Sequence, residues 1–158
     1  MATKGLNHAV LYVSNAQASA DFYGKALGMA PVATMPGAAF LRSPESDSHH
    51  DLGLFQLQPG APKIPTGTGT GLYHLAWEVG SIDELSDMMT RLSEMGSLVG
   101  MSDHGVSRSL YAKDPDGIEF EVLWVVPRED WGAAEHDAMV KPLDLKRDIE
   151  RYSTRTKA

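Results

Sequence analysis

The chain has 158 residues, 42% of them hydrophobic, which suits one domain or two small fused modules with a real core. Its formal net charge of −7 argues against a nucleic-acid partner, and no Lys/Arg run or long apolar stretch points to a membrane. The absence of cysteine excludes disulfides, thiolate metal sites and a cysteine nucleophile; with no recognisable signal peptide, we expect a cytoplasmic protein.

The first predicted element is a strand over residues 6–13, which is rich in aliphatic and β-branched residues. Ser14 or Asn15 can cap a helix over residues 16–27, and Gly28 ends it. Shorter β-like runs follow at residues 32–35, 39–42 and 51–57. The first part of the chain therefore predicts the order β-α-β-β-β.

The same order recurs after residues 58–71, a Pro-, Gly- and Thr-rich stretch that is typical of a linker. A strand over residues 72–79 repeats the first one, with His74 in the place of His8. A capping box that begins at Ser81 starts the second helix, and Gly96 ends it. Further strands are predicted at residues 98–101, 109–113 and 119–125.

We therefore expect an α+β fold of two tandem βαβββ modules, residues 1–57 and 72–127, which form a curved half-barrel around a metal site. One copy of the repeat cannot close a half-barrel, and the linker permits the two modules to pair within one chain or across two chains; we predict a homodimer. Residues 128–158 are more charged, and residues 143–152 could form a short amphipathic helix. We interpret this segment as an appendage packed on the body.

The repeat singles out a candidate metal site of His8, His74 and Glu121, with Gln56 aligned to Glu121 as a fourth position. A lone histidine in a strand is more often a hydrogen-bonded core residue. Two histidines at equivalent places change that balance, and so does a carboxylate in an apolar strand, because a buried carboxylate needs a compensating charge. Two imidazoles and one carboxylate favour Fe(II), with Mn(II) as the alternative.

Residues 114–121, with the sequence DPDGIEFE, resemble the signature that closes glyoxalase, bleomycin-resistance and extradiol dioxygenase domains. Asn7-His8, the DFY triplet at 21–23 and Leu27-Gly28 resemble the first module of the same family. The chain is thus similar to the vicinal-oxygen-chelate superfamily, closest to catechol-2,3-dioxygenase-like proteins. The resemblance implies that Glu121, four residues after the glycine, is a metal ligand.

The resemblance further implies an extradiol-type ring-cleaving dioxygenase that acts on a catecholic aromatic substrate and O2. It matches His50 to the histidine that handles protons in such enzymes, and Tyr111 to a hydrogen-bond donor beside the substrate. Arg108 stands where relatives usually carry histidine, so we expect it to contact an acidic substrate, with His104 as a second candidate contact. Alternatively, His50 and His104 are exposed loop residues, and Tyr111 has a structural role only.

Two other functions stay open. A lyase or isomerase of the glyoxalase or epimerase type resembles the fold but typically uses four ligand positions, two of them glutamates, whereas this chain has Gln56 as the second. A non-enzymatic small-molecule binder, as in antibiotic resistance, usually has no metal ligands. The intact set of His8, His74 and Glu121 argues against the binder.

Overall fold

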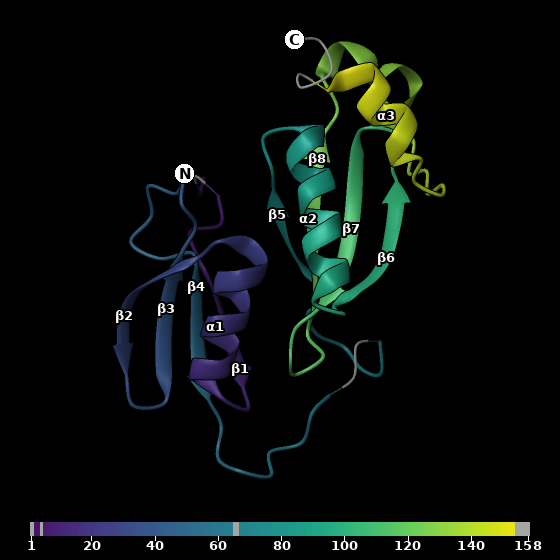
Figure 1. The fold of residues 1–158 in the computed structure, drawn as a ribbon. Coiled ribbons are helices and arrows are strands. Elements are labelled where there is room, and N and C mark those ends of the chain that lie inside the picture. The colour runs from purple at the N-terminus through teal and green to yellow at the C-terminus, as the bar shows by residue number, and fades with distance from the viewer. Residues whose placement is uncertain (1, 4, 65–66, 154–158) are drawn as a thin grey trace. The chain divides into compact units, whose positions relative to one another are not determined.

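The computed structural model describes residues 2–3, 5–64 and 67–153 (Figure 1). It divides into two compact units. The first holds the described residues up to 64 together with Asp114–Gly117, and the second holds residues 67–113 and 118–153. The predicted α+β fold with two βαβββ repeats is confirmed, and each repeat forms an open four-stranded sheet. None of the described helices has both the length and the apolar character needed to cross a membrane.

The first unit builds its sheet in the order β1-β4-β3-β2, with β1 parallel to β4 and the other neighbours antiparallel. Asn15 caps the helix by accepting a hydrogen bond from the Ala18 backbone N–H, and Gly28 ends it at φ +72. Leu11 and Val13 alternate with the exposed Val10 and Tyr12, so one sheet face is buried in the core. The elements are β1 (Ala9–Val13), α1 (Ala16–Leu27), β2 (Ala30–Met35), β3 (Ala38–Arg42) and β4 (Leu52–Gln56).

The second unit repeats this arrangement in the order β5-β8-β7-β6, again with the first and last strands parallel. The predicted capping box is confirmed: the Ser81 hydroxyl accepts from the Glu84 backbone N–H at 3.2 Å, and the Glu84 carboxylate accepts from the Ser81 N–H at 3.1 Å. The elements are β5 (Leu75–Glu78), α2 (Ile82–Glu94), β6 (Leu98–Asp103), β7 (Ser107–Lys113) and β8 (Glu119–Val125).

Two segments of the family signature meet within the first unit. The hydroxyl of Tyr23, which is fully buried in α1, donates to Asp114 Oδ2 at 3.2 Å. Asp116 accepts from the Ser14 backbone N–H at 2.7 Å and pairs with Lys63 at 2.8 Å. Burial, reinforced by Asp114, raises the pKa of Tyr23 far above its ordinary value, so this hydroxyl remains a hydrogen-bond donor. These residues serve the fold.

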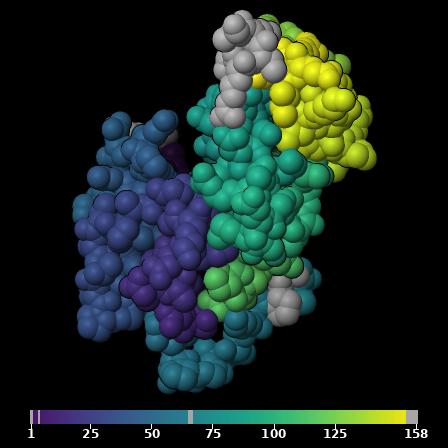
Figure 2. All heavy atoms as spheres, viewed as in Figure 1, coloured from purple at the N-terminus to yellow at the C-terminus, as the bar shows by residue number. Residues whose placement is uncertain are grey.

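The segment after β8 packs on the second unit through α3 (Leu145–Tyr152), which falls within the predicted helix. It is preceded by two short 3-10 helices, η1 (Arg128–Asp130) and η2 (Gly132–His136). Figure 2 shows the yellow α3 segment lying against the teal surface of this unit. The Ser153 hydroxyl lies 2.6 Å from Asp83 of α2, in a buried hydrogen bond. Lys141 exchanges two backbone hydrogen bonds with Asp103 at the end of β6, at 2.8 and 2.9 Å.

Candidate metal site

His74 and Glu121 lie side by side in the second unit. His74 comes directly before β5, and β5 pairs with β8 so that Ala76 is opposite Glu121. The Nε2 atom of His74 lies 3.1 Å from Glu121 Oε2, and Glu121 is only 7% exposed. A carboxylate buried to this degree is stable only beside a compensating positive charge, which a protonated imidazole or a cation can provide.

The donor geometry of this pair fits a divalent ion. Two ligand atoms, each ~2.1 Å from one ion and at right angles to each other, lie ~3.0 Å apart, close to the observed separation. The Nδ1 atom of His74 is buried and has no hydrogen-bond partner within the described part of the chain. An unpartnered buried nitrogen costs free energy, and Nδ1 is the ring nitrogen that does not face Glu121.

Tyr111 completes a polar group on the same sheet. It lies directly opposite Glu121 in the β7–β8 register, and its ring centroid is 5.8 Å from that of His74. Its hydroxyl oxygen is 2.8 Å from Nε2 of His104. Burial and the nearby Glu121 carboxylate raise the pKa of Tyr111, so its hydroxyl is protonated near neutral pH. The predicted neighbours Glu121, His74 and Tyr111 are thus brought together in one unit.

The first unit brings the other two predicted histidines together. His8 comes directly before β1, as His74 does before β5, and its ring centroid is 4.6 Å from that of His50. The Nδ1 atom of His8 lies 2.8 Å from Asn7 Oδ1, which leaves Nε2 with a lone pair if Nδ1 carries the proton. Burial, and then His8, lower the pKa of His50, and Phe40 packs edge-on against its ring.

Each unit contributes part of the predicted metal triad. His8 belongs to the first unit, whereas His74 and Glu121 belong to the second. Among the described residues, no group of three or more His, Cys, Asp or Glu side chains is arranged to hold a metal ion. The grouping of His8 with His74 and Glu121 therefore stays a prediction.

The strand registers correct the predicted equivalence of Gln56 and Glu121. Two residues after His74, Ala76 pairs with Glu121; two residues after His8, Val10 pairs with Gly53. Gly53 is therefore the equivalent of Glu121.

Gln56 lies opposite Val13, which belongs to the buried face of the first sheet. Its side-chain oxygen accepts from the Ala16 backbone N–H at 3.2 Å, at the start of α1. The sequence alignment matched Gln56 to Glu121 because an aromatic residue precedes each of them. The match failed because the number of residues between the histidine before the first strand and the equivalent position in the last strand differs between the two repeats. No carboxylate thus stands in the first unit at the place of Glu121.

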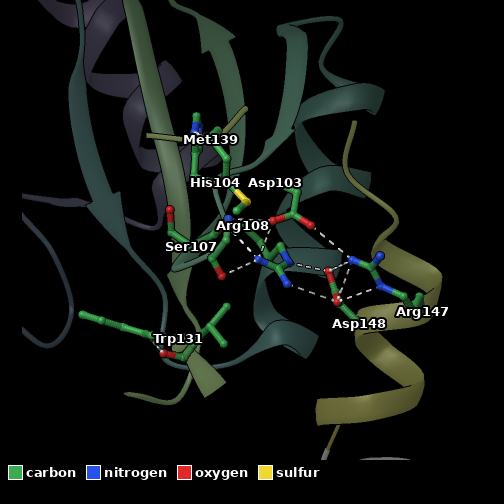
Figure 3. A network of polar contacts seen from close by, with 10 residues as sticks. Asp103, His104, Ser107, Arg108, Trp131, Met139, Arg147 and Asp148 are labelled. Atoms are coloured by element: carbon green, nitrogen blue, oxygen red, sulfur yellow. Dashed lines mark hydrogen bonds and ion pairs between the residues drawn. The ribbon is translucent and has the colours of Figure 1, made fainter. Parts of the chain in front are cut away.

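Arg108 does not have the position expected of a substrate contact. It is 7% exposed, its Nε donates to Asp148 Oδ2 at 2.5 Å, and its Nη1 donates to Asp103 Oδ1 at 2.8 Å (Figure 3). Nη1 also donates to the Gly105 carbonyl at 3.0 Å. Both carboxylates already balance its charge, so Arg108 holds α3 against β6 and β7 in place of the predicted contact with an acidic substrate.

His104 also has a role that the sequence did not reveal. Besides its contact with Tyr111, its Nδ1 lies 3.1 Å from the backbone oxygen of Met139, in the segment between η2 and α3. No local pattern signals this contact, because it joins a side chain to a main-chain oxygen 35 residues away.

A family model for the "Glyoxalase/Bleomycin resistance protein/Dioxygenase superfamily" matches residues 5–122. The chain belongs to this superfamily, as the resemblance of its motifs predicted. The particular activity within the superfamily is a separate question, because members differ in chemistry on one fold.

Two curated relatives are dioxygenases. The chain is 32% identical over 126 residues to catechol-2,3-dioxygenase from Bacillus subtilis, which covers 80% of this chain and 43% of that protein. It is 33% identical over 116 residues to biphenyl-2,3-diol 1,2-dioxygenase 3 from Rhodococcus globerulus, covering 73% of this chain and 60% of that protein. The chain therefore spans about half the length of the curated relatives it matches.

Solved structures share the fold. A glyoxalase/dioxygenase from Nostoc punctiforme matches with a TM-score of 0.65 at 24% identity, over 78% of this chain and 92% of that chain. A mutant fosfomycin resistance protein from Listeria monocytogenes, complexed with Mn(II) and 1S,2S-dihydroxypropylphosphonic acid, matches with a TM-score of 0.62 at 16% identity, over 85% of this chain and all of that chain.

Proposed function

We propose that the chain binds one divalent metal ion, Fe(II) in preference to Mn(II), through His8, His74 and Glu121. We further propose that it cleaves a catecholic substrate with O2 in the extradiol manner. The observation that carries the proposal is the contact at 3.1 Å between the half-buried His74 and the buried Glu121, with Tyr111 beside them. The similarity to catechol and biphenyl-diol dioxygenases supports the choice of reaction.

The metal would supply the electrostatic activation that brings a catechol and O2 together. The side chains of this chain have the remaining tasks. His50, which is partly buried against Phe40 and His8, would accept and return a proton at its imidazole nitrogen. Tyr111 would form a hydrogen bond with a substrate hydroxyl.

The first unit also offers an apolar surface to an aromatic ring. Phe40 packs edge-on against His50, and Phe55 packs edge-on against Phe40 with ring centroids 5.7 Å apart. Tyr12, which pairs with Phe55 in the sheet, is 71% exposed. Aromatic side chains of this kind favour a flat, largely apolar ligand over a small polar one.

Gly53 is the reason to prefer a dioxygenase over a glyoxalase-type lyase. Such lyases typically use two glutamate ligands, one of which acts as a base. The place equivalent to Glu121 holds a glycine in this chain, which has no side chain to bind a metal or to remove a proton. A site with one carboxylate keeps positions on the ion open for a bidentate substrate and O2.

Metal binding is the first test. Purified protein is loaded anaerobically with Fe(II) or Mn(II), and metal content is measured for the wild type, His74→Ala and Glu121→Gln. Both variants should lose stoichiometric binding. Glu119→Gln, a matched change on the same strand, should not. Equal metal content in wild type and Glu121→Gln would remove Glu121 from the site.

The reaction is tested next with Fe(II)-loaded protein and a panel of substituted catechols, by O2 uptake and by the absorbance of a ring-opened product. His50→Gln should slow turnover by roughly 10²-fold with metal content unchanged, the scale of a lost general acid or base. If no catechol gives O2 uptake and the protein shows turnover in a lyase or epimerase assay, the lyase or isomerase function is favoured instead. Ligand binding without any metal affinity would favour the binder.

We also propose that the protein forms a homodimer. Light scattering at micromolar concentration should give about twice the 17.1 kDa mass of one chain. A particle of a single chain's mass at every concentration would exclude it.

A further inference from the structure

A chain of hydrogen bonds connects the segment after η2 to Tyr111. The backbone oxygen of Met139 lies 3.1 Å from Nδ1 of His104, and the other ring nitrogen of His104 lies 2.8 Å from the Tyr111 hydroxyl. Figure 3 shows His104 beside Met139, next to the Arg108 network. Tyr111 in turn lies opposite Glu121 and beside His74, the two predicted metal ligands of this unit.

Elementary hydrogen-bond chemistry determines where the protons lie in this chain. A carbonyl oxygen can only accept, so Nδ1 of His104 must carry a proton. In the neutral ring, Nε2 is then an acceptor, and the hydroxyl of Tyr111 must donate to it. The Tyr111 oxygen can therefore only accept from its other neighbours, which include the hydroxyls of Ser102 and Ser109.

The segment that carries Met139 is held firmly in place. Lys141, two residues further, exchanges two backbone hydrogen bonds with Asp103, the residue before His104. The Arg108–Asp148 ion pair then holds α3 to β7. Gly105 leaves room for this packing. A Cβ at Gly105 would lie 2.6 Å from the Ala134 Cβ and 3.0 Å from the Met139 Sδ.

We propose that residues 137–141 are part of the functional site. Through the Met139 carbonyl they fix the proton of His104, and His104 in turn makes Tyr111 a hydrogen-bond acceptor toward a bound ligand. Such a site selects a ligand whose hydroxyl still carries its proton. His104 and Met139 act as positioning residues. The ligand part of the inference rests on the proposed function, whereas the hydrogen-bond chain does not.

This arrangement reverses the role that the family resemblance implies for Tyr111. As a donor, Tyr111 would favour a substrate oxygen that has already lost its proton. As an acceptor, it orients a hydroxyl that still carries its proton.

The first test reads the tautomer of His104 in metal-free protein with ¹⁵N-labelled histidine, from the two-bond proton–nitrogen pattern in NMR spectra. We expect the proton on Nδ1. Gly105→Ala should shift that pattern, because the new methyl group displaces Met139. Gly96→Ala is the matched control: its φ of +66 resembles the +79 of Gly105, but a Cβ there meets nothing within 4 Å. A wild-type proton on Nε2 would overturn the proposal.

The second test measures anaerobic binding of 4-nitrocatechol to Fe(II)-loaded protein by its absorbance change. His104→Phe removes the acceptor for Tyr111 and should weaken binding about tenfold with metal content unchanged. His104→Gln offers an amide oxygen in its place and should retain most of the affinity. Equal affinities of the two variants would overturn the proposal. The wild type could show no O2 uptake while the NMR pattern and the affinity difference between the two His104 variants are as expected. That result would overturn the proposed ring cleavage and leave this inference standing.

Discussion

The two units use the same order of elements to present different side chains at equivalent places. Each has a histidine directly before its first strand. Beside that position the first unit carries Gly53 and Phe40, whereas the second carries Glu121 and Tyr111. The first unit thus places the ring of His50 beside its histidine, whereas the second places the Glu121 carboxylate and the ring of Tyr111 beside its own.

This difference shows which part of a repeat is free to change. Sheet hydrogen bonds involve only the backbone, so they tolerate almost any side chain on a face that does not form the core. The opposite faces carry the cores of the two units and have stayed apolar, with Leu52 and Leu54 in the first and Phe120 and Val122 in the second fully or nearly fully buried. The two units therefore differ in side chains on one face of the sheet, while the other face forms the core.

The largest expected effect concerns the ion network of Arg108, Asp103 and Asp148 in the second unit. Arg108→Met leaves the buried Asp148 and Asp103 with Arg147, a 55% exposed side chain, as their remaining ion-pair partner, and should lower the free energy of unfolding by about 3 kcal/mol. Urea denaturation measures it. Arg128→Met breaks an exposed pair with Glu135 and should cost less than about 1 kcal/mol. Equal losses in the two variants would show that the network does not hold α3.

The second effect concerns the signature turn of the first unit. Tyr23→Phe removes the buried hydrogen bond to Asp114 and should lower the free energy of unfolding by about 1–3 kcal/mol, because the carboxylate loses a donor. Tyr12→Phe, a change on the 71% exposed side chain of β1, is the control and should leave stability within about 0.5 kcal/mol. Indistinguishable denaturation curves for Tyr23→Phe and wild type would contradict a structural role.

The third prediction makes the two units more alike. Gly53→Glu gives the first unit the carboxylate that Glu121 provides in the second, and we expect metal affinity to rise about tenfold and O2 uptake to fall. The new Cβ would lie 3.3 Å from Val10 Cγ2, so the Val10 side chain must shift by a few tenths of an ångström to admit it. Gln56→Glu is the matched control and should leave metal affinity unchanged. If Gln56→Glu binds metal more tightly and Gly53→Glu does not, then Gln56 and not Gly53 is the counterpart of Glu121.

The smallest effect is a pH dependence in the first unit. Burial alone would raise the pKa of Asp116, but hydrogen bonds from Lys63 and Ser14 outweigh it and hold the pKa below its ordinary value of 3.8. A lowered folded-state pKa contributes stability above the unfolded value and loses it as the pH falls through the folded value.

Asp116→Asn should therefore cost less than about 1 kcal/mol at neutral pH, since Lys63 is 56% exposed, and the difference from wild type should vanish in strongly acidic solution. Thermal unfolding at several pH values measures this, with Asp47→Asn as an exposed control. A difference that grows on acidification would contradict the assignment.

The sequence by itself determined the elements and the residue types of the site. The caps at Asn15 and Ser81 and the alternation along each strand involve neighbouring residues only, so the βαβββ repeats could be predicted from them. The repeat also picked out His74 and Glu121, which the structure places in contact. Local hydrogen bonds and side-chain alternation arise between residues close in the chain, and a sequence pattern records them directly.

Only the tertiary structure decided which residues are equivalent and what the polar side chains bind. The pairing of Val10 with Gly53 replaced Gln56 as the counterpart of Glu121, because strand register is set by packing and not by local composition. The burial of Arg108 against Asp148 depends on a helix 40 residues away. The contact of His104 with the Met139 carbonyl joins residues 35 positions apart. Charge pairing and proton position require partners that the fold brings from distant parts of the chain, and no sequence spacing encodes them.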